Sequence, residues 1–312
     1  MKNSLTAKVI ILLSQYFCYL FTQMIHPRLP SLEMESGTSA GSSKNNVYFS
    51  TTSGSYHYPC HATPYLLLAN FRESGDYMLN NRKMTVSDNY FYMLNPGDRL
   101  EIDFKKKRDL ETFLVAFDEE FIADALHFAT RSEGELLDHP LKEGLEFLAV
   151  PSVPFIMNDE IARQLHLILK SSREEEILKE ILISFFQLLD DTENRLQNLS
   201  AVKRITREEI YRRLFLSEEF IRGHLSDSIS LEQMAGAACL NSFHYLKLFK
   251  ELFHTTPHQY LIGLRLEKAY DQLKRGRSSV TEVCYSSGFQ SPASFSHLFK
   301  KTFGFSPSEL VK

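Results

Sequence analysis

The chain of 312 residues has only four cysteines, and they stand far apart. Cys18, Cys60, Cys239 and Cys284 show neither the close spacing of a zinc site nor that of a redox-active pair. This spacing disfavours a disulfide framework and indicates free thiols in a reducing compartment. We therefore expect a cytoplasmic protein.

The chain also lacks a hydrophobic run long enough to cross a membrane. Its most apolar stretch, VIILLSQYFCYLF at residues 9–21, has thirteen residues and follows Lys2 and Lys8, whereas a transmembrane helix needs about twenty. The stretch resembles the charged and apolar regions of a signal peptide, but no small-residue cleavage site follows closely. We expect residues 1–45 to be a disordered leader, of which 1–33 is a mis-assigned start or an extension. A membrane-tethered protein that uses 9–21 stays open as an alternative.

A strong excess of positive charge is absent too, since the formal net charge is −4. The whole chain is therefore not an obvious binder of polyanions. The charge is uneven, however, because residues 227–312 carry ten Lys and Arg against seven Asp and Glu, a net charge of +3. The rest of the chain is left with a net charge of −7. The basic end is a modest indication of a nucleic-acid partner there.

Short apolar and aromatic runs separated by turn residues fill residues 47–117. Such runs stand at 65–71, 89–94 and 110–117. Short strands at this spacing indicate a β-sandwich or a small barrel. The KKKR stretch at 105–108 is predicted as a solvated hairpin turn.

From about residue 118 the apolar period becomes helical. We predict helices over 118–129, 158–172, 173–196 and 208–225. The third of these has an apolar stripe wider than one exposed face needs, formed by Ile177, Leu178, Ile181, Leu182, Phe185 and Phe186. Packing against the β region and self-association both stay open as its role.

One short pattern occurs twice near the C-terminus. FHYLKLFKELFHTTPHQYL at 243–261 is echoed by SFSHLFKKTFGFSPSEL at 294–310. Two capping boxes accompany each copy, one before it and one near its end. In a capping box a Ser or Thr precedes a Gln or Glu by three residues and so marks the start of a helix. The four pairs are Ser230 with Gln233, Thr256 with Gln259, Ser279 with Glu282, and Ser306 with Glu309.

These signals predict a short helix, a tight turn and a second helix in each copy. The second helices are expected over 242–253 and 291–303, joined by a long helix over 257–274. This helix-turn-helix geometry binds DNA. The turn needs a residue that tolerates positive φ, which Gly288 supplies in the second copy. Cys239 stands there in the first copy, at a cost of about 1 kcal/mol.

The second copy reads GFQSPASFSHLFKKTFGFSP over 288–307, and with it residues 227–312 resemble the DNA-binding domain of AraC/XylS-family transcription regulators. The resemblance covers about a quarter of the chain. It implies a regulator that binds double-stranded promoter DNA, contacts RNA polymerase and forms a homodimer, and whether it acts as an activator or as a repressor stays open. It also implies structural roles for Arg265 and Ala269. The sequence departs from the family pattern at Cys239, where glycine is usual, and at Leu246, which is apolar at a position that faces the groove. Two interpretations of Leu246 stay open: it touches a thymine methyl group, or the first copy binds DNA more loosely than the second.

The resemblance further implies an α+β organisation, with a cupin-like β-barrel or sandwich that serves as a sensor. The sensor and a helical dimerisation segment are expected over 46–205, and the all-α DNA-binding domain over 206–312. Aromatic residues on the strands could line a cavity for a small-molecule effector or simply fill a barrel: Tyr65, Phe71, Tyr77, Tyr90, Phe91 and Tyr92. No His-x-His pair lies in 47–117, so we expect no metal, no cofactor and no enzyme activity. A cupin-type metal enzyme stays an alternative through His57, Cys60 and His61.

The candidate DNA-binding residues lie on the faces of the second helices that are opposite their apolar stripes. The N-terminal half of a recognition helix meets base edges, and basic residues farther along meet phosphates. The first copy offers Phe243, His244, Leu246, Lys247 and Lys250; the second offers Ala293, Ser294, Ser296, His297, Lys300 and Lys301.

Overall fold

The computed structural model describes residues 24–30, 45–130, 148–201, 203–276 and 278–311. The chain divides into two compact units, Met1–Thr192 and Glu193–Lys312. The apolar stretch 9–21 lies outside the described residues, as does most of the expected leader 1–45. Among the residues that are described, no helix is both long enough and apolar enough to cross a membrane.

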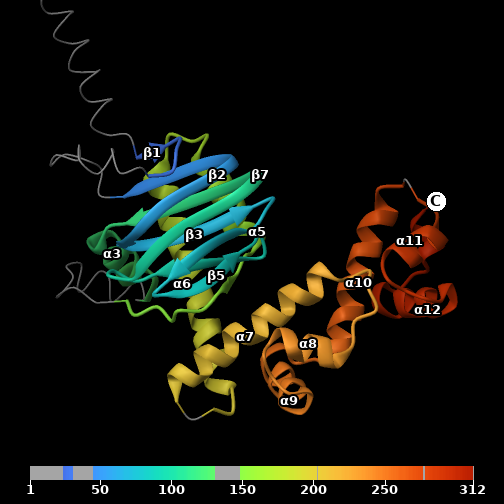
Figure 1. Ribbon diagram of the computed structural model, residues 1–312. Helices are drawn as coiled ribbons and strands as arrows, with labels where there is room; N and C mark the ends of the chain where they lie inside the picture. The colour runs from blue at the N-terminus through green and yellow to red at the C-terminus, as the bar shows by residue number, and fades with distance from the viewer. Residues whose placement is uncertain (1–23, 31–44, 131–147, 202, 277, 312) are drawn as a thin grey trace, which may run out of the picture. The chain divides into compact units, whose positions relative to one another are not determined.

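The N-terminal unit is built on one mixed sheet (Figure 1). Its strands pair in the order β1-β2-β7-β3-β6-β8, and β4 pairs with both β5 and β7. Every pairing is antiparallel except that of β1 with β2. The strands are β1 Ile25–His26, β2 Asn46–Ala62, β3 Tyr65–Phe71, β4 Gly75–Leu79, β5 Arg82–Val86, β6 Tyr90–Leu94, β7 Arg99–Phe117 and β8 Phe155–Ile156. Across the described strands the path runs from β1 to β8 without closing, so the expected cupin-like barrel is not confirmed.

The KKKR stretch lies inside β7, and the prediction of a hairpin turn there is wrong. β7 pairs with β2 along almost its whole length, and the register shifts around Gly54, which faces Lys107. The backbone takes a positive φ at Gly54 (113°) and at Lys106 (53°). A β-bulge bends a strand without ending it, so the four basic residues mark a bend in a long strand pair.

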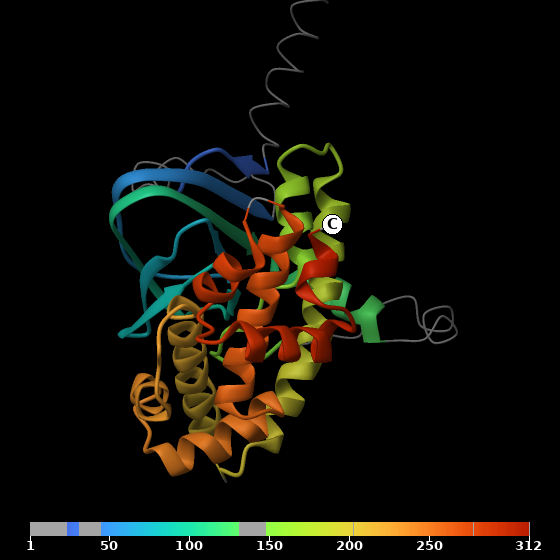
Figure 2. The same ribbon diagram turned by 90° about the vertical axis from the view of Figure 1, so that its right-hand side faces the viewer.

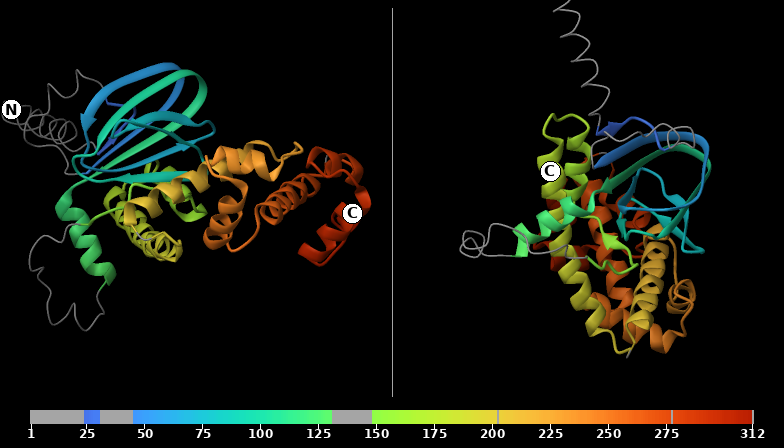
Figure 3. Two further views of the ribbon diagram at one scale, coloured as in Figure 1. Left: turned by 60° about the horizontal axis from the view of Figure 1, so that its bottom comes forward. Right: turned by 90° about the vertical axis from the view of Figure 1, so that its left-hand side faces the viewer.

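The sheet separates two apolar cores. One face packs against three helices, α3 Glu119–Thr130, α5 Asp159–Ile168 and α6 Glu174–Asn198. Figures 2 and 3 show the curled sheet, with the yellow-green helices α5 and α6 along one face. The other face encloses a cluster of strand residues together with Leu29.

The apolar stripe of α6 belongs to the first core. Ile177, Leu178, Ile181, Leu182 and Phe185 are all buried there against sheet residues. The core interpretation of this stripe is therefore confirmed. Self-association would have to use other side chains of α6.

The aromatic side chains that could line a cavity are divided between the two faces. Tyr65 and Phe91 pack in the helix-covered core. Tyr77 and Tyr92 pack in the strand-enclosed cluster. These four side chains are parts of two separate packed cores.

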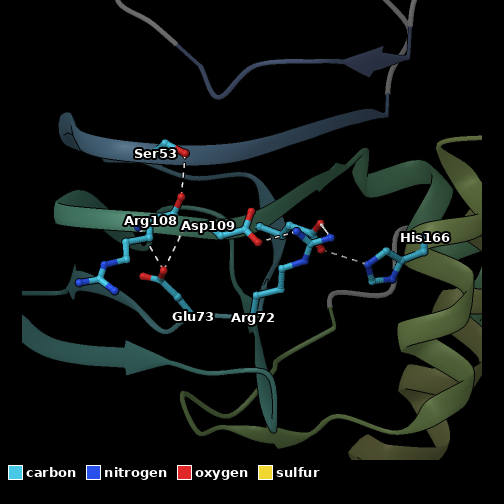
Figure 4. Close-up of polar contacts among 7 residues, drawn as sticks. Ser53, Arg72, Glu73, Arg108, Asp109 and His166 are labelled. Carbon is cyan, nitrogen blue, oxygen red and sulfur yellow. Dashed lines mark hydrogen bonds and ion pairs between the residues drawn. The ribbon is translucent and has the colours of Figure 1, made fainter.

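A group of charged side chains ties α5 to β7 beside the end of β3 (Figure 4). Arg72 bridges two acids of β7, with 2.6 Å from Nη1 to Oδ2 of Asp109 and 2.8 Å from Nη2 to Oε1 of Glu111. His166 Nε2 lies 3.4 Å from Oε2 of Glu111, and its ring meets Phe71 edge-on at 4.6 Å between centroids. Glu111 is nearly buried, so its two partners offset the cost of removing its charge from water.

The C-terminal unit consists of helices. They are α7 Arg204–Gly223, α8 Leu231–Ala237, α9 Ser242–Phe253, α10 Pro257–Lys274, α11 Val280–Ser286, α12 Pro292–Phe303 and α13 Pro307–Leu310. The predicted limits of α9 and α10 agree with the structure, and α12 begins one residue later than predicted. Helices α8 and α9 form the first motif and α11 and α12 the second, with α10 between the two motifs (Figure 1).

All four predicted capping boxes are present in the structure. In each, the Ser or Thr side chain meets the third backbone N–H of the helix and the Gln or Glu reaches back to the cap. Pro257, Pro292 and Pro307 stand in the first turn of their helices, where a missing N–H costs nothing. Local sequence therefore sets the starts of these helices.

Candidate nucleic-acid interface

Each motif turns sharply between its two helices at a residue with positive φ. Cys239 has a φ of 52° in the first motif, and Gly288 has a φ of 87° in the second. The prediction of a strained cysteine in the first turn is therefore confirmed. The second turn is also crowded, because a Cβ on Gly288 would fall 2.4 Å from the carbonyl oxygen of Leu225.

Arg265 of α10 connects this turn to the segment that precedes the first motif. Its Nε donates to the carbonyl of Leu225 at 2.7 Å, and its Nη2 donates to the carbonyl of Asp227 at 2.6 Å. Ala269, one turn farther along α10, is fully buried. Both residues therefore have the structural roles that the family resemblance implies.

The buried sides of α9 and α12 hold the recognition helices in place. On α9, Tyr245, Leu248, Phe249 and Leu252 are buried. On α12, Phe295 and Phe299 are fully buried, and their rings meet edge-on, while the ring of Phe303 contacts that of Phe299 at a tilt. The opposite face of each helix is consequently left to solvent.

The candidate residues lie on these open faces. All five in the first motif and five of the six in the second are exposed, and Ser296 is half-buried. The two helices also match position by position: Phe243 corresponds to Ala293, Leu246 to Ser296, and Lys247 to His297. The structure therefore collects each set on one helix face, which is the arrangement that a groove-reading helix needs.

The basic side chains of the interface differ in their surroundings. Lys247 Nζ lies 3.7 Å from Oε1 of Glu251 on its own helix. Lys250, Lys300 and Lys301 stand exposed in the last turns of α9 and α12. Positive charge there complements the helix dipole and is well placed for phosphate oxygens.

A buried polar network that joins α7 to α10 has no counterpart in the sequence analysis. Glu218 of α7 is only 1% exposed, pairs with Arg222 and accepts a hydrogen bond of 2.6 Å from the Tyr260 hydroxyl. Burial raises the pKa of Glu218, although Arg222 and Tyr260 act against that rise. The four-residue spacing of Glu218 and Arg222 was the available signal, but burial could not be read from it.

A groove of about 760 Å³ opens beside the second motif. Its walls come from α10, from α11 with the turn that follows it, and from the first half of α12, including Ser294. Tyr285 lines it and is 55% exposed. The groove adjoins the candidate DNA-binding face, and the sequence contained no signal for it.

Cysteine and metal chemistry gain no support from the described residues. Cys60, Cys239 and Cys284 are free thiols, as predicted; Cys18 lies outside that part of the chain. Within it, no three His, Cys, Asp or Glu side chains are placed to hold a metal ion. His61 instead contacts the carbonyl of Pro59 through Nδ1 at 3.0 Å.

Comparison with known proteins supports the helix-turn-helix interpretation of this part of the chain. Residues 234–312 match the family model of a helix-turn-helix domain. The chain is 27% identical over 140 residues to the probable transcriptional regulator LumQ of Photobacterium leiognathi, with 45% of this chain and 54% of LumQ covered. It is 34% identical over 91 residues to the HTH-type transcriptional activator RhaS of Escherichia fergusonii, with 29% and 33% covered. The matches thus span about half or less of these relatives.

A solved structure also resembles about a third of the chain. It is a Chromobacterium violaceum transcriptional regulator described as an AraC-type DNA-binding domain-containing protein, which is 23% identical, covers 32% of this chain and 88% of its own, and has a TM-score of 0.31. That TM-score is low, so the sequence matches carry the assignment. Both curated relatives are named as transcription regulators. Residues 234–312 of this chain therefore match a helix-turn-helix domain, and the curated relatives that share sequence with the chain are transcription regulators.

Proposed function

We propose that the chain is a sequence-specific DNA-binding regulator of transcription that places α9 and α12 in successive major grooves. The observation that carries this proposal is the double arrangement of two capped helices in one unit, each with its candidate residues on the open face. Successive major-groove segments on one side of a duplex lie about 34 Å apart. A second recognition helix doubles the length of sequence that is read.

The roles of the side chains follow from their places along the helices. Ser294 and His297 stand in the first half of α12, where hydrogen bonds to base edges distinguish sequences. Lys300 and Lys301 stand at its end, where phosphate contacts strengthen binding without selecting a sequence. On α9, Lys247 takes the position for contacts with base edges, and Lys250 takes the position for contacts with phosphates.

The proposal is tested by selecting bound sequences from random double-stranded DNA with the full chain. We expect a site with two preferred segments, centred about ten base pairs apart. Enrichment of a single segment would contradict the use of both helices, and no enrichment would contradict sequence-specific binding. Lys105→Ala, which removes one exposed positive charge from the N-terminal unit, is the control and should select the same DNA sequence as the wild type.

We further propose that the N-terminal unit sets this activity through a homodimer or a small-molecule effector. Leu167 of α5 and Ile183 of α6 support the homodimer, because they are 40% and 42% exposed on the helices that cover the sheet. Sedimentation velocity tests it: Ile183→Glu should shift a dimer toward monomer, whereas an unchanged distribution contradicts this surface.

We also propose that the protein acts in the cytoplasm, where the chromosome lies. There it would activate transcription through RNA polymerase. The test is transcription in vitro from a promoter that contains the selected site. Added protein should raise the yield of transcript. A fall in yield would mean repression instead.

A further inference from the structure

Two large apolar side chains stand in the open on the recognition helix of the first motif. Phe243 is 78% exposed and Leu246 is 37% exposed. Residues three apart on a helix are neighbours on one face, so the two form a continuous apolar surface, which we call the Phe243–Leu246 patch. The matched positions of α12 carry Ala293 and Ser296, so the second motif has no such surface.

The fold does not use the patch. The apolar positions that hold α9 in place are Tyr245, Leu248, Phe249 and Leu252, and all of them are buried. Phe243 and Leu246 are left outside this core, where burial would contribute to binding and not to folding.

The surroundings of the patch indicate what covers it. His244 and Lys247 are exposed on either side of Leu246 along the helix, and Lys250 follows one turn farther on. A basic rim around an apolar centre suits a surface that is negatively charged at its edges and apolar in the middle. The DNA major groove has that character wherever thymine presents its 5-methyl group between the phosphate strands.

We propose that the first motif recognises thymine through its 5-methyl group, which Phe243 and Leu246 cover, while the second motif reads its segment through hydrogen bonds from Ser294 and His297. This inference rests on the proposed function and names the base chemistry that α9 selects. A protein partner for the same patch is the competing occupant, and the experiment separates the two.

The experiment replaces each thymine of the selected site in turn by deoxyuridine, which lacks only the methyl group. Binding of the full chain is then measured by titration at fixed salt. Covering one methyl group corresponds to about a fourfold change in affinity, so we expect a loss of about that size at one or more thymines of the segment that α9 reads. A 5-methylcytosine in place of cytosine at the same position should recover part of the affinity.

The matched variant is Phe243→Ala with Leu246→Ser, which gives the first motif the side chains of the second. The inference expects this variant to bind thymine and deoxyuridine sites equally, since a double-mutant cycle isolates the contact between side chain and methyl group. Lys105→Ala, an exposed residue of the N-terminal unit, is the control and should keep the full response to the missing methyl group. Thermal unfolding and retained protection of the other segment confirm that the variant is folded.

The outcomes distinguish a failure of the proposed function from a failure of the thymine contact. If no DNA sequence is enriched by the wild-type chain, the proposed function fails. If a sequence is enriched but no thymine responds to loss of its methyl group, or the response survives in the double variant, this inference is overturned and the proposed function stands. Weakened association between protein molecules, with the methyl response unchanged, would also overturn it and assign the patch to a protein partner.

Discussion

The guanidinium of Arg265 lies against the backbone of Gly288, so that a Cβ added at Gly288 would fall 2.8 Å from Arg265 Nε. The same Nε donates to the carbonyl of Leu225. The turn of the second motif therefore packs against the hydrogen bond between Arg265 of α10 and Leu225, which lies in the segment that precedes the first motif.

Gly288→Ala is expected to destabilise the C-terminal unit by about 3 kcal/mol, because it adds a left-handed backbone penalty to a contact that cannot relax cheaply. Urea denaturation of the full chain measures the loss. Gly304→Ala is the matched control, since Gly304 has a φ of 86° but no neighbour near its Cβ position. Equal losses at both glycines would contradict the role assigned to Arg265 and Leu225.

Cys239→Gly is expected to stabilise the first motif by about 0.5–1 kcal/mol, because glycine adopts the φ of 52° without the steric penalty of a Cβ. The same denaturation experiment measures the gain. Cys239→Ser keeps the Cβ and loses the thiol, so it should leave stability nearly unchanged. A gain from serine as large as that from glycine would show that the thiol, and not the backbone, is the source.

Lys300→Ala is expected to weaken binding to all DNA sequences alike and to reduce the slope of log affinity against log salt by about one, because one phosphate contact is lost. Gel-shift titrations over a range of salt concentrations provide the slope. An unchanged slope would place the Lys300 ammonium away from the phosphates.

His297→Ala and Lys247→Ala are expected to reduce discrimination between the selected site and altered sites, by about 1–3 kcal/mol for each lost base contact. The measurement is the ratio of affinities for the two sites at one salt concentration. Loss of affinity with an unchanged ratio would move these side chains from base edges to the backbone of the DNA.

Glu218 predicts a pH dependence of stability. Burial raises its folded pKa, so its contribution is fully present below the usual value of about 4.3 and is lost as pH rises through the raised value. The free energy of unfolding of the wild type, relative to Glu218→Gln, should therefore fall as the pH rises from the usual carboxyl pKa through the raised pKa of Glu218. A difference that grows with pH would mean that the ion pair with Arg222 outweighs burial.

The two motifs could be predicted from the sequence because their signals are local. A capping box is satisfied by atoms three residues apart, as Ser230 and Gln233 show. Many helices end at a single residue of positive φ, as α12 does at Gly304. Neither depends on the rest of the chain, so limits such as those of α9 and α10 agree with the structure.

The sheet was harder because its pairing is remote in sequence. Thr112 of β7 faces Ser50 of β2, sixty-two residues earlier, and no local pattern specifies that register. The KKKR stretch resembled a turn for this reason, since charge and polarity are equally compatible with a bulge. The sequence likewise did not show whether the apolar stripe of α6 packs against the sheet or against a second copy of the chain. Amphipathicity shows that one face of a helix is buried, but it does not show which surface covers that face.

Composition and spacing were thus sufficient for the duplicated helix-turn-helix, its caps, its strained Cys239 turn and the identity of its outward residues. Folding was needed to place Arg265 against Gly288 and to bury Glu218 with Tyr260. The physical reason is range. Backbone hydrogen bonds at helix ends join near neighbours, whereas burial and exposure are properties of surfaces that meet only after distant segments have packed together.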